Sequence, residues 1–112
     1  EVMNIIGDVS GKTVVLVDDM IDTAGTLCNA AAAILNKGAK EVFACATHGV
    51  LSGPALERIE GSALKELILL DTIPLRSPCK KITMLPVAPL FAEAIARIYE
   101  DKPMSTMFGL NS

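Results

Sequence analysis

The stretch at residues 12–18, which reads KTVVLVD, constrains the fold more than any other part of this sequence. It is a continuous run of mostly β-branched apolar residues, and such runs fit a strand that is buried on both faces, as in parallel sheets. An alanine-rich segment at residues 26–37 follows, and its four consecutive alanines favour a helix that lies close to a sheet. Since parallel strands need a crossover connection, the two segments together predict an α/β fold.

The same alternation continues along the chain. Apolar runs predict further strands at residues 42–47, 66–70 and 82–85, and helical patterns lie at residues 55–60 and 87–99. The expected architecture is a mostly parallel sheet flanked by helices, in one domain that spans residues 1–112.

Turn residues set the expected boundaries of these elements. Gly38 is expected to end the alanine-rich helix, and Ser52 is expected to cap the next helix, with Pro54 near its first position. The apolar residues 4–6 and the turn-forming residues 8–11 predict a small hairpin at the entry.

The last predicted helix, residues 87–99, carries apolar side chains at helical spacing. We expect Leu90, Ala94 and Ile98 to face the core, with Phe91 and Ile95 as further candidates.

The composition fits one globular domain. The chain has 112 residues, of which 51% are hydrophobic, so a core is available and disorder is not expected. The 10 basic and 13 acidic residues give a net charge of −3, and only 4% of residues are aromatic. These values argue against a nucleic-acid-binding surface. No apolar run reaches the roughly 18 residues of a membrane span, which predicts a soluble protein without a membrane partner.

The three cysteines, Cys28, Cys45 and Cys79, are odd in number, and no two of them have the spacing of a metal site. Reduced thiols are therefore expected. The first ten residues contain acidic but no basic side chains, which argues against a secretory signal. Both observations predict a cytoplasmic protein.

The segment VVLVDDMIDTAGT, residues 14–26, contains the candidate ligand-binding residues. In open parallel sheets, ligands bind at the carboxyl ends of the strands, which is where this segment leaves the first strand. Small residues let backbone N–H groups approach an anion, and the N-terminus of the following helix adds partial positive charge. The hydroxyls of Thr23 and Thr26 can donate to phosphate oxygens. Residues 22–26, which we call the 22–26 loop, are therefore predicted to hold a phosphate monoester.

Asp18 and Asp19 cannot contact that phosphate favourably, because like charges repel. They are suited to accept hydrogen bonds from sugar hydroxyls, or to bind Mg²⁺ directly or through water. A phosphate loop beside an acidic pair describes a ribose 5-phosphate group with its hydroxyls and a metal. Asp22 has three candidate roles, which are to cap the helix, to orient the loop or to accept a proton. The segment has neither the Gly-Lys-Ser/Thr ending of a Walker loop nor a GxGxxG pattern.

On these residues the chain resembles a known family. VVLVDDMIDTAGT is similar to the phosphoribosyl-binding signature of type I phosphoribosyltransferase folds. The form DDMIDTAGT resembles that of the ribose-phosphate pyrophosphokinases, also called phosphoribosyl pyrophosphate synthetases. The resemblance covers nearly the whole chain, through the segments NIIGDVSGK, ATHGVLSGPALERI, DTIPL, LFAEAIARI and MSTMF.

The resemblance implies a transfer of the β,γ-diphosphoryl group of Mg-ATP to the 1-hydroxyl of ribose 5-phosphate, which gives phosphoribosyl pyrophosphate and AMP. It implies that Asp18 and Asp19 bind the ribose hydroxyls, with Mg²⁺ as a metal that they hold directly or through water. The residues implied in 5-phosphate binding are Asp22, Thr23, Ala24, Gly25 and Thr26.

The resemblance also implies that this chain is the C-terminal half of a longer enzyme with two similar α/β halves. In the family, the other half makes most ATP contacts, and a flexible basic loop supplies the catalytic Lys and Arg. Residues 1–11 contain no Lys or Arg, and the chain begins at Glu1 rather than Met. We therefore expect this chain to present the sugar-phosphate site, to contain no catalytic residue and to be inactive alone.

Two further regions have open assignments. Ser105, Thr106 and Phe108 correspond to a family tail that joins a subunit interface and helps to form a regulatory site for phosphate or ADP. Pro103 stands where the family often has Ser, so a regulatory role and a plain interface role both stay open. The resemblance implies a homo-oligomer, a hexamer in the intact enzyme. His48 follows the second strand and is either a substrate or metal contact or a loop histidine bonded to backbone.

Three alternatives share part of this pattern. A phosphoribosyltransferase has the same loop chemistry but lacks the later segments. A non-catalytic regulatory subunit of the synthetases often has a degenerate signature, whereas both acids and both threonines are intact here. A phospho-receiver domain also pairs acids after an early strand, but Pro86 stands where it needs a hydroxyl-bearing strand end.

Overall fold

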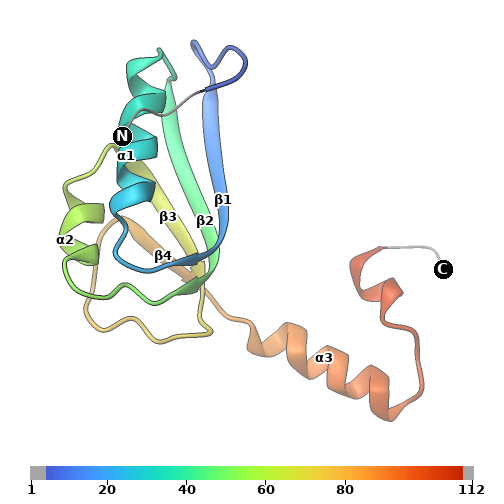
Figure 1. Ribbon diagram of the computed structural model, residues 1–112. Coiled ribbons are helices and arrows are strands. Elements are labelled where there is room, and N and C mark those ends of the chain that lie inside the picture. Colours follow the sequence, from blue (N-terminus) through green and yellow to red (C-terminus); the bar gives the residue numbers. More distant parts are fainter. Residues whose placement is uncertain (1–4, 110–112) are drawn as a thin grey trace.

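A computed structural model describes residues 5–109. Its four strands form one sheet in the order β1-β2-β3-β4, and all neighbouring strands are parallel. The strands are β1 (Thr13–Ile21), β2 (Glu41–Gly49), β3 (Leu64–Leu70) and β4 (Ile82–Leu85). The helices are α1 (Gly25–Asn36), α2 (Ala55–Glu60), α3 (Ala88–Tyr99) and a short 3₁₀ helix, η1 (Ser105–Phe108). The predicted α/β fold with a parallel sheet is confirmed (Figure 1).

The helices α1 and α2 lie on the same side of the sheet and cover one of its faces (Figure 1). Alternate residues of β2 are buried, because successive side chains of a strand point to opposite faces. The core between helices and sheet contains, among others, Ala31, Ile34, Val42, Ala44, Ala55, Ile59, Leu67 and Leu69. The N-terminus of α1 is thereby fixed above the carboxyl end of β1.

The opposite face of the sheet is open. Val15 and Val17 of β1 are 56% and 79% exposed. The prediction that this strand is buried on both faces is wrong for the described residues, because α1 and α2 cover only one side. The expected flanking by helices is therefore one-sided as well.

Helix α3 leaves the end of β4 and projects away from the sheet (Figure 1). None of its 12 residues is buried, and Ile98 is 68% exposed. The expectation that Leu90, Ala94 and Ile98, with Phe91 and Ile95 as further candidates, face the core is wrong, because α3 stands away from the sheet (Figure 1) and buries none of its residues. The radius of gyration is 17.0 Å, against about 13 Å for a compact domain of this size, so the molecule is elongated. No helix among the described residues is long and apolar enough to cross a membrane.

Several predicted boundaries also need correction. The first strand runs on to Ile21, so Asp18 and Asp19 lie inside β1 rather than after it. Ser52 does not cap α2, whose N-cap is Pro54. No hairpin forms at the entry within residues 5–12, and the expectation for Asn4 falls outside the described residues. The first predicted helix stop is confirmed, because Gly38 follows α1 with a φ of 97°.

Candidate functional site

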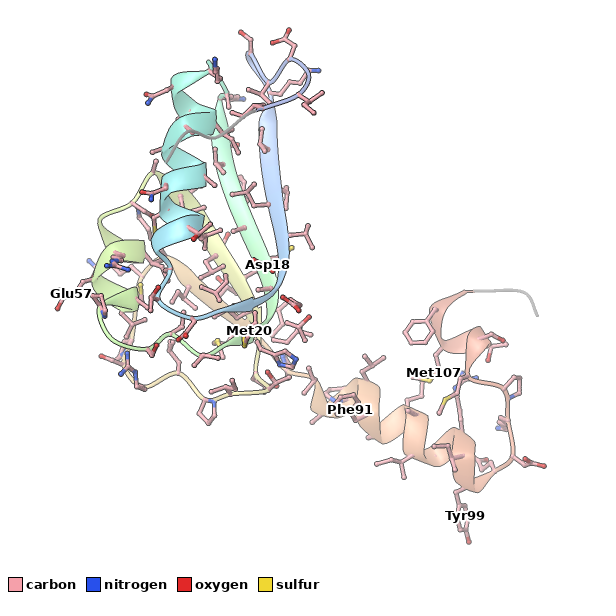
Figure 2. All side chains as sticks on the ribbon, viewed as in Figure 1. Asp18, Met20, Glu57, Phe91, Tyr99 and Met107 are labelled. Carbon is pink, nitrogen blue, oxygen red and sulfur yellow. The ribbon has the colours of Figure 1, made fainter. Side chains whose placement is uncertain are left out.

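A pocket of about 290 Å³ opens where β1 leads into α1. Figure 2 shows Asp18 and Met20 at this end of the sheet. The residues that line the pocket are Asp18, Met20, Ile21, Asp22, Thr23, Ala24, Gly25, Thr26 and Leu27. The structure therefore brings together every residue predicted for the sugar-phosphate site except Asp19.

The backbone of the 22–26 loop turns sharply before α1. Ala24 is the N-cap and has a left-handed conformation, with φ 67° and ψ 6°. The first helical hydrogen bond runs from the Cys28 N–H to the Ala24 carbonyl, at 3.0 Å. The N–H groups of residues 25–27 precede that bond and have no partner within the helix, as at any helix N-terminus. They are available to an anion in the pocket.

Asp18 and Asp19 are both exposed at the end of β1. A carboxylate oxygen of Asp18 accepts a hydrogen bond from the Asp19 N–H at 2.8 Å. Successive side chains of a strand point to opposite faces, which is consistent with Asp18 lining the pocket and Asp19 not lining it. Of the predicted pair, therefore, only Asp18 lines the pocket.

The oxygen donors of Asp18 and Asp19 fit Mg²⁺ only as part of a ligand set. Among residues 5–109, no group of three or more His, Cys, Asp or Glu side chains is placed to hold a metal ion. Proteins often hold Mg²⁺ through one or two carboxylates, with substrate oxygens and water completing the octahedron. The carboxylate of Asp18, which lines the pocket, is compatible with that mode.

Asp22 is hydrogen-bonded to the segment that follows β2. The Ser52 hydroxyl donates to the Asp22 carboxylate, and the Ser52 N–H donates to the Asp22 carbonyl at 3.1 Å. The alternative that Asp22 caps α1 is wrong, since α1, which lies wholly in the described part of the chain, has no side-chain cap hydrogen bond.

Arg58 is a residue near this site that the sequence reasoning missed. Its Nη1 atom donates to the Thr23 carbonyl at 3.2 Å from α2, 35 residues along the chain. Spacing cannot reveal such a contact, because only the fold brings α2 beside the loop. The one signal was the segment ATHGVLSGPALERI, which carried part of the family resemblance and contains Arg58.

His48 makes a side-chain contact at the end of β2. Its Nδ1 atom lies 2.7 Å from the Thr72 hydroxyl, which itself donates to the Thr47 carbonyl at 3.2 Å. Because the Thr72 proton is used for that carbonyl, Nδ1 is the donor to Thr72. His48 is therefore held by a threonine side chain, which differs from the expected backbone partner.

The predicted C-terminal residues lie far from the pocket, beyond α3 (Figure 1). The Thr106 hydroxyl accepts from Arg97 and donates to the Pro103 carbonyl at 3.1 Å. The Nε atom of Arg97 and the hydroxyl of Ser105 are buried and have no hydrogen-bond partner among the described residues. Phe108 is 61% exposed.

The cysteines are free thiols, and all three are partly buried. Burial raises the pKa of Cys28, while a hydrogen bond with Ser62 and the charges of Arg58 and Lys81 oppose that shift. A raised pKa keeps the Cys28 thiol protonated at neutral pH.

A family model and the sequences of known proteins both match this chain along nearly its whole length. Residues 1–109 match the family described as the phosphoribosyl synthetase-associated domain. A ribose-phosphate pyrophosphokinase of Clostridium acetobutylicum is 64% identical over 110 residues, which are 96% of this chain and 34% of that protein. One from Caldanaerobacter subterraneus is 62% identical over 110 residues, 96% of this chain and 35% of that protein. The chain thus spans about a third of the length of these relatives.

A solved structure agrees with the sequence comparison. The phosphoribosylpyrophosphate synthetase from Mycobacterium smegmatis has a TM-score of 0.79 and 44% sequence identity to this chain. The match covers 86% of this chain and 33% of that one. The resemblance noted in the sequence is confirmed.

Proposed function

We propose, from the premise that this chain belongs to the family of the phosphoribosyl synthetase-associated domain, that it carries the ribose 5-phosphate site of a ribose-phosphate diphosphokinase. One observation carries the proposal. The 22–26 loop opens the 12-residue helix α1 at the end of β1, in one pocket with the Asp18 carboxylate. A phosphate needs N–H groups and the positive end of a helix, whereas sugar hydroxyls need an acceptor, and ribose 5-phosphate carries both kinds of group.

In the proposed reaction, the 1-hydroxyl oxygen of ribose 5-phosphate attacks the β-phosphorus of ATP. The bond between this phosphorus and the oxygen that bridges to the α-phosphorus breaks, AMP leaves and the hydroxyl proton goes to solvent. The product is phosphoribosyl pyrophosphate. The part of this chain is to hold the 5-phosphate and the sugar hydroxyls, which orients the 1-hydroxyl toward ATP.

In this proposal the chain is the C-terminal part of a longer two-domain protein. The remainder of that protein binds ATP and supplies the catalytic Lys and Arg side chains. The share of the relatives that the chain spans, 34% and 35%, supports a longer protein, whereas the two domains and the C-terminal position rest on the family resemblance. The proposal predicts no diphosphate transfer by these 112 residues alone.

Mg²⁺ is the proposed metal. Asp18 and Asp19 would hold it, directly or through water, together with oxygens of the substrates. Bound there, it would neutralise part of the negative charge that the two phosphorylated substrates bring together. Asp18 and Asp19 also accept hydrogen bonds from the ribose hydroxyls in the proposed complex.

The proposal includes a cytoplasmic homo-oligomer. The free thiols support a reducing compartment. The exposed apolar side chains of β1 and α3, such as Val17 and Ile98, support burial in a larger assembly. A hexameric assembly rests on the family resemblance.

A regulatory or interface role is proposed for Ser105, Thr106 and Phe108. The Arg97 guanidinium, which donates to the Thr106 hydroxyl, and the unpartnered Ser105 hydroxyl support it, because a guanidinium and a hydroxyl can each donate to an anion. Titration with inorganic phosphate separates the two roles. Saturable binding that Ser105→Ala weakens supports regulation, whereas a changed oligomer mass without phosphate binding supports a plain interface.

Calorimetric titration with ribose 5-phosphate, with and without Mg²⁺, tests the main proposal in the protein at its natural chain length. We expect saturable binding that weakens at least about tenfold in each of two variants. Asp18→Asn loses the charged acceptor for the sugar hydroxyls, and Thr26→Val loses a hydroxyl that donates to the phosphate. Thr13→Val, which removes an exposed hydroxyl at the other end of β1, is the matched control and should bind as the parent does. Absence of binding at millimolar ligand, or equal binding by Thr26→Val, would contradict the proposal.

The alternatives are separated by an activity assay alongside the titration. A phosphoribosyltransferase would bind phosphoribosyl pyrophosphate and consume it with a nucleobase. A non-catalytic subunit would bind ribose 5-phosphate, but its natural-length protein would form no AMP from ATP. The proposed synthetase forms AMP only when ribose 5-phosphate is present.

A further inference from the structure

The carbonyl groups that lead into the 22–26 loop are held by a distant segment. The Val50 and Leu51 N–H groups donate to the Ile21 carbonyl at 2.9 and 3.2 Å. The Ser52 N–H donates to the next carbonyl, that of Asp22, at 3.1 Å. The consecutive carbonyls of Ile21, at the end of β1, and Asp22, in the loop, therefore point toward the connection between β2 and α2.

The third carbonyl in this series is held by a side chain. Arg58 Nη1 donates to the Thr23 carbonyl at 3.2 Å, and the Ser52 hydroxyl in addition donates to the Asp22 carboxylate. We call the N–H groups of Val50, Leu51 and Ser52, together with the Arg58 guanidinium, the carbonyl clamp.

The clamp dictates where the loop N–H groups point. In a trans peptide, the C=O and the following N–H lie in one plane and point in opposite directions. Since the three consecutive carbonyls of Ile21, Asp22 and Thr23 face the clamp, the N–H groups of Asp22, Thr23 and Ala24 point away from it. Consecutive N–H groups on one side of a loop can form an anion-binding concavity, and the clamp keeps the repelling carbonyl oxygens away from that side.

The residue types at positions 24 and 25 support this interpretation. Ala24 has a left-handed conformation, which glycine adopts at lower cost, whereas Gly25 is the first residue of α1, where alanine is the better helix former. The Ala24 side chain is buried in the core, at 5% exposure, so its methyl group holds the loop. A Cβ on Gly25 would lie 3.1 Å from Arg58 Nη1, so the space at position 25 is occupied by Arg58.

We propose that Arg58 and Ser52 are positioning residues for the phosphate of ribose 5-phosphate, which they hold in place through the carbonyls and the carboxylate of the 22–26 loop without a catalytic role of their own. The inference rests on the proposed function. The loop itself contains no Lys or Arg, so Arg58 also brings a positive charge to the back of the phosphate site.

Variants at position 58 test the proposal, in the protein at its natural chain length. Arg58→Met removes the donor and the charge while keeping a helix former, and we expect the Kd and KM for ribose 5-phosphate to rise about fivefold. We expect kcat at saturating substrate and the KM for ATP to change less than about twofold. Arg58→Lys and Arg58→Gln each keep a donor and should restore most of the affinity. Lys65→Met, which removes an exposed cation on β3, is the control for net charge and should leave affinity unchanged.

A double-mutant cycle separates positioning from simple stabilisation of the fold. Gly25→Ala should displace Arg58 from Thr23 and weaken ribose 5-phosphate binding severalfold. In an Arg58→Met background the same change should weaken binding less than it does in the parent protein, because the contact between Arg58 and Thr23 is already lost. A merely structural Arg58 would lower the melting temperature, leave the affinity unchanged, and give no coupling in the cycle, and that result overturns the proposal.

Thr26→Val distinguishes failure of this inference from failure of the proposed function. If the parent protein binds ribose 5-phosphate and Thr26→Val does not, while Arg58→Met and Ser52→Ala bind as tightly as the parent, only the clamp is wrong. If the parent protein itself fails to bind ribose 5-phosphate, the proposed function is wrong, and the proposed role of the carbonyl clamp is wrong as well.

Discussion

Helices α1 and α3 are each 12 residues long and both carry an apolar face, but only α1 is packed against the sheet. Helix α1 buries Ala30, Ala31 and Ile34, whereas α3 buries none of its residues. Figure 2 shows Tyr99 at the far end of α3, clear of the sheet, and this side chain is 91% exposed. An amphipathic pattern therefore specifies which face of a helix needs cover but not what covers it.

The difference matters for function, because the candidate site depends on the packed helix. The N-terminus of α1 can present N–H groups to a ligand only while Ala31 and Ile34 hold the helix on the sheet. Helix α3 contributes no residue to the pocket. We therefore expect substitutions in the covered half to affect stability, and those in α3 to affect it little.

The largest expected effect is that of Leu67→Ala in β3. Leu67 is completely buried beneath the helices, so the substitution should lower the free energy of unfolding by about 3 kcal/mol through lost burial and a cavity. Urea unfolding followed by circular dichroism measures this. A loss below about 1 kcal/mol would show that the covered face is not the stabilising core.

Gly49→Ala at the end of β2 should have the next largest effect. An added Cβ would lie 2.6 Å from Leu69 Cδ1, so the core must shift, at a cost of about 2 kcal/mol. Gly61→Ala is the matched control, because its Cβ would meet the Glu57 carbonyl at an ordinary 3.5 Å. Thermal unfolding of both variants should show a clear loss for the first and almost none for the second.

Ionisation of the Cys28 thiol on α1 is expected to have a smaller effect on the free energy of unfolding. Burial raises its pKa above the ordinary value of 9.0, so the folded state favours the neutral thiol. The associated stability is fully present below about pH 9 and is lost as the pH rises through the folded pKa, because the unfolded state ionises first. Stability measured from pH 7 to 10.5 should fall less steeply in Cys28→Ala than in the parent. An equal slope in both proteins would contradict a buried Cys28.

The smallest expected effect is that of Ile98→Ala on α3. Ile98 is 68% exposed, so the change should alter the free energy of unfolding by less than about 0.5 kcal/mol. This prediction is for the isolated 112-residue chain. A loss close to that of Leu67→Ala would mean that α3 packs onto the body in solution, and it would remove the contrast between the two helices.

Local sequence patterns predicted the positions of the strands well, but they predicted poorly which faces of the strands are covered by other elements. The bounds of α2 and β4 agree with the prediction, because turn residues such as Gly61 and short apolar runs mark them in the sequence. The 22–26 loop was found because its small residues lie directly between strand and helix signals. The open face of β1 was not foreseen, because a β-branched run looks the same whether or not a layer covers it.

The contacts of Ser52 and Arg58 with the loop were missed for a different reason. Each joins residues 30 or more positions apart, and only the parallel pairing of β1 with β2 brings them together. Ser52 looked like a helix cap because Pro54 follows it. A sequence pattern reports a local preference, whereas its partner depends on the tertiary fold.

The central claim is that the 22–26 loop binds the 5-phosphate through its backbone N–H groups. Amide chemical shifts of isotope-labelled protein at its natural chain length test it most directly, in titrations with ribose 5-phosphate, inorganic phosphate and ribose. We predict saturable shifts of the amides of residues 22–26 with both phosphate-containing ligands and none with ribose. Shifts confined to other regions, or none with millimolar ribose 5-phosphate, would contradict the claim.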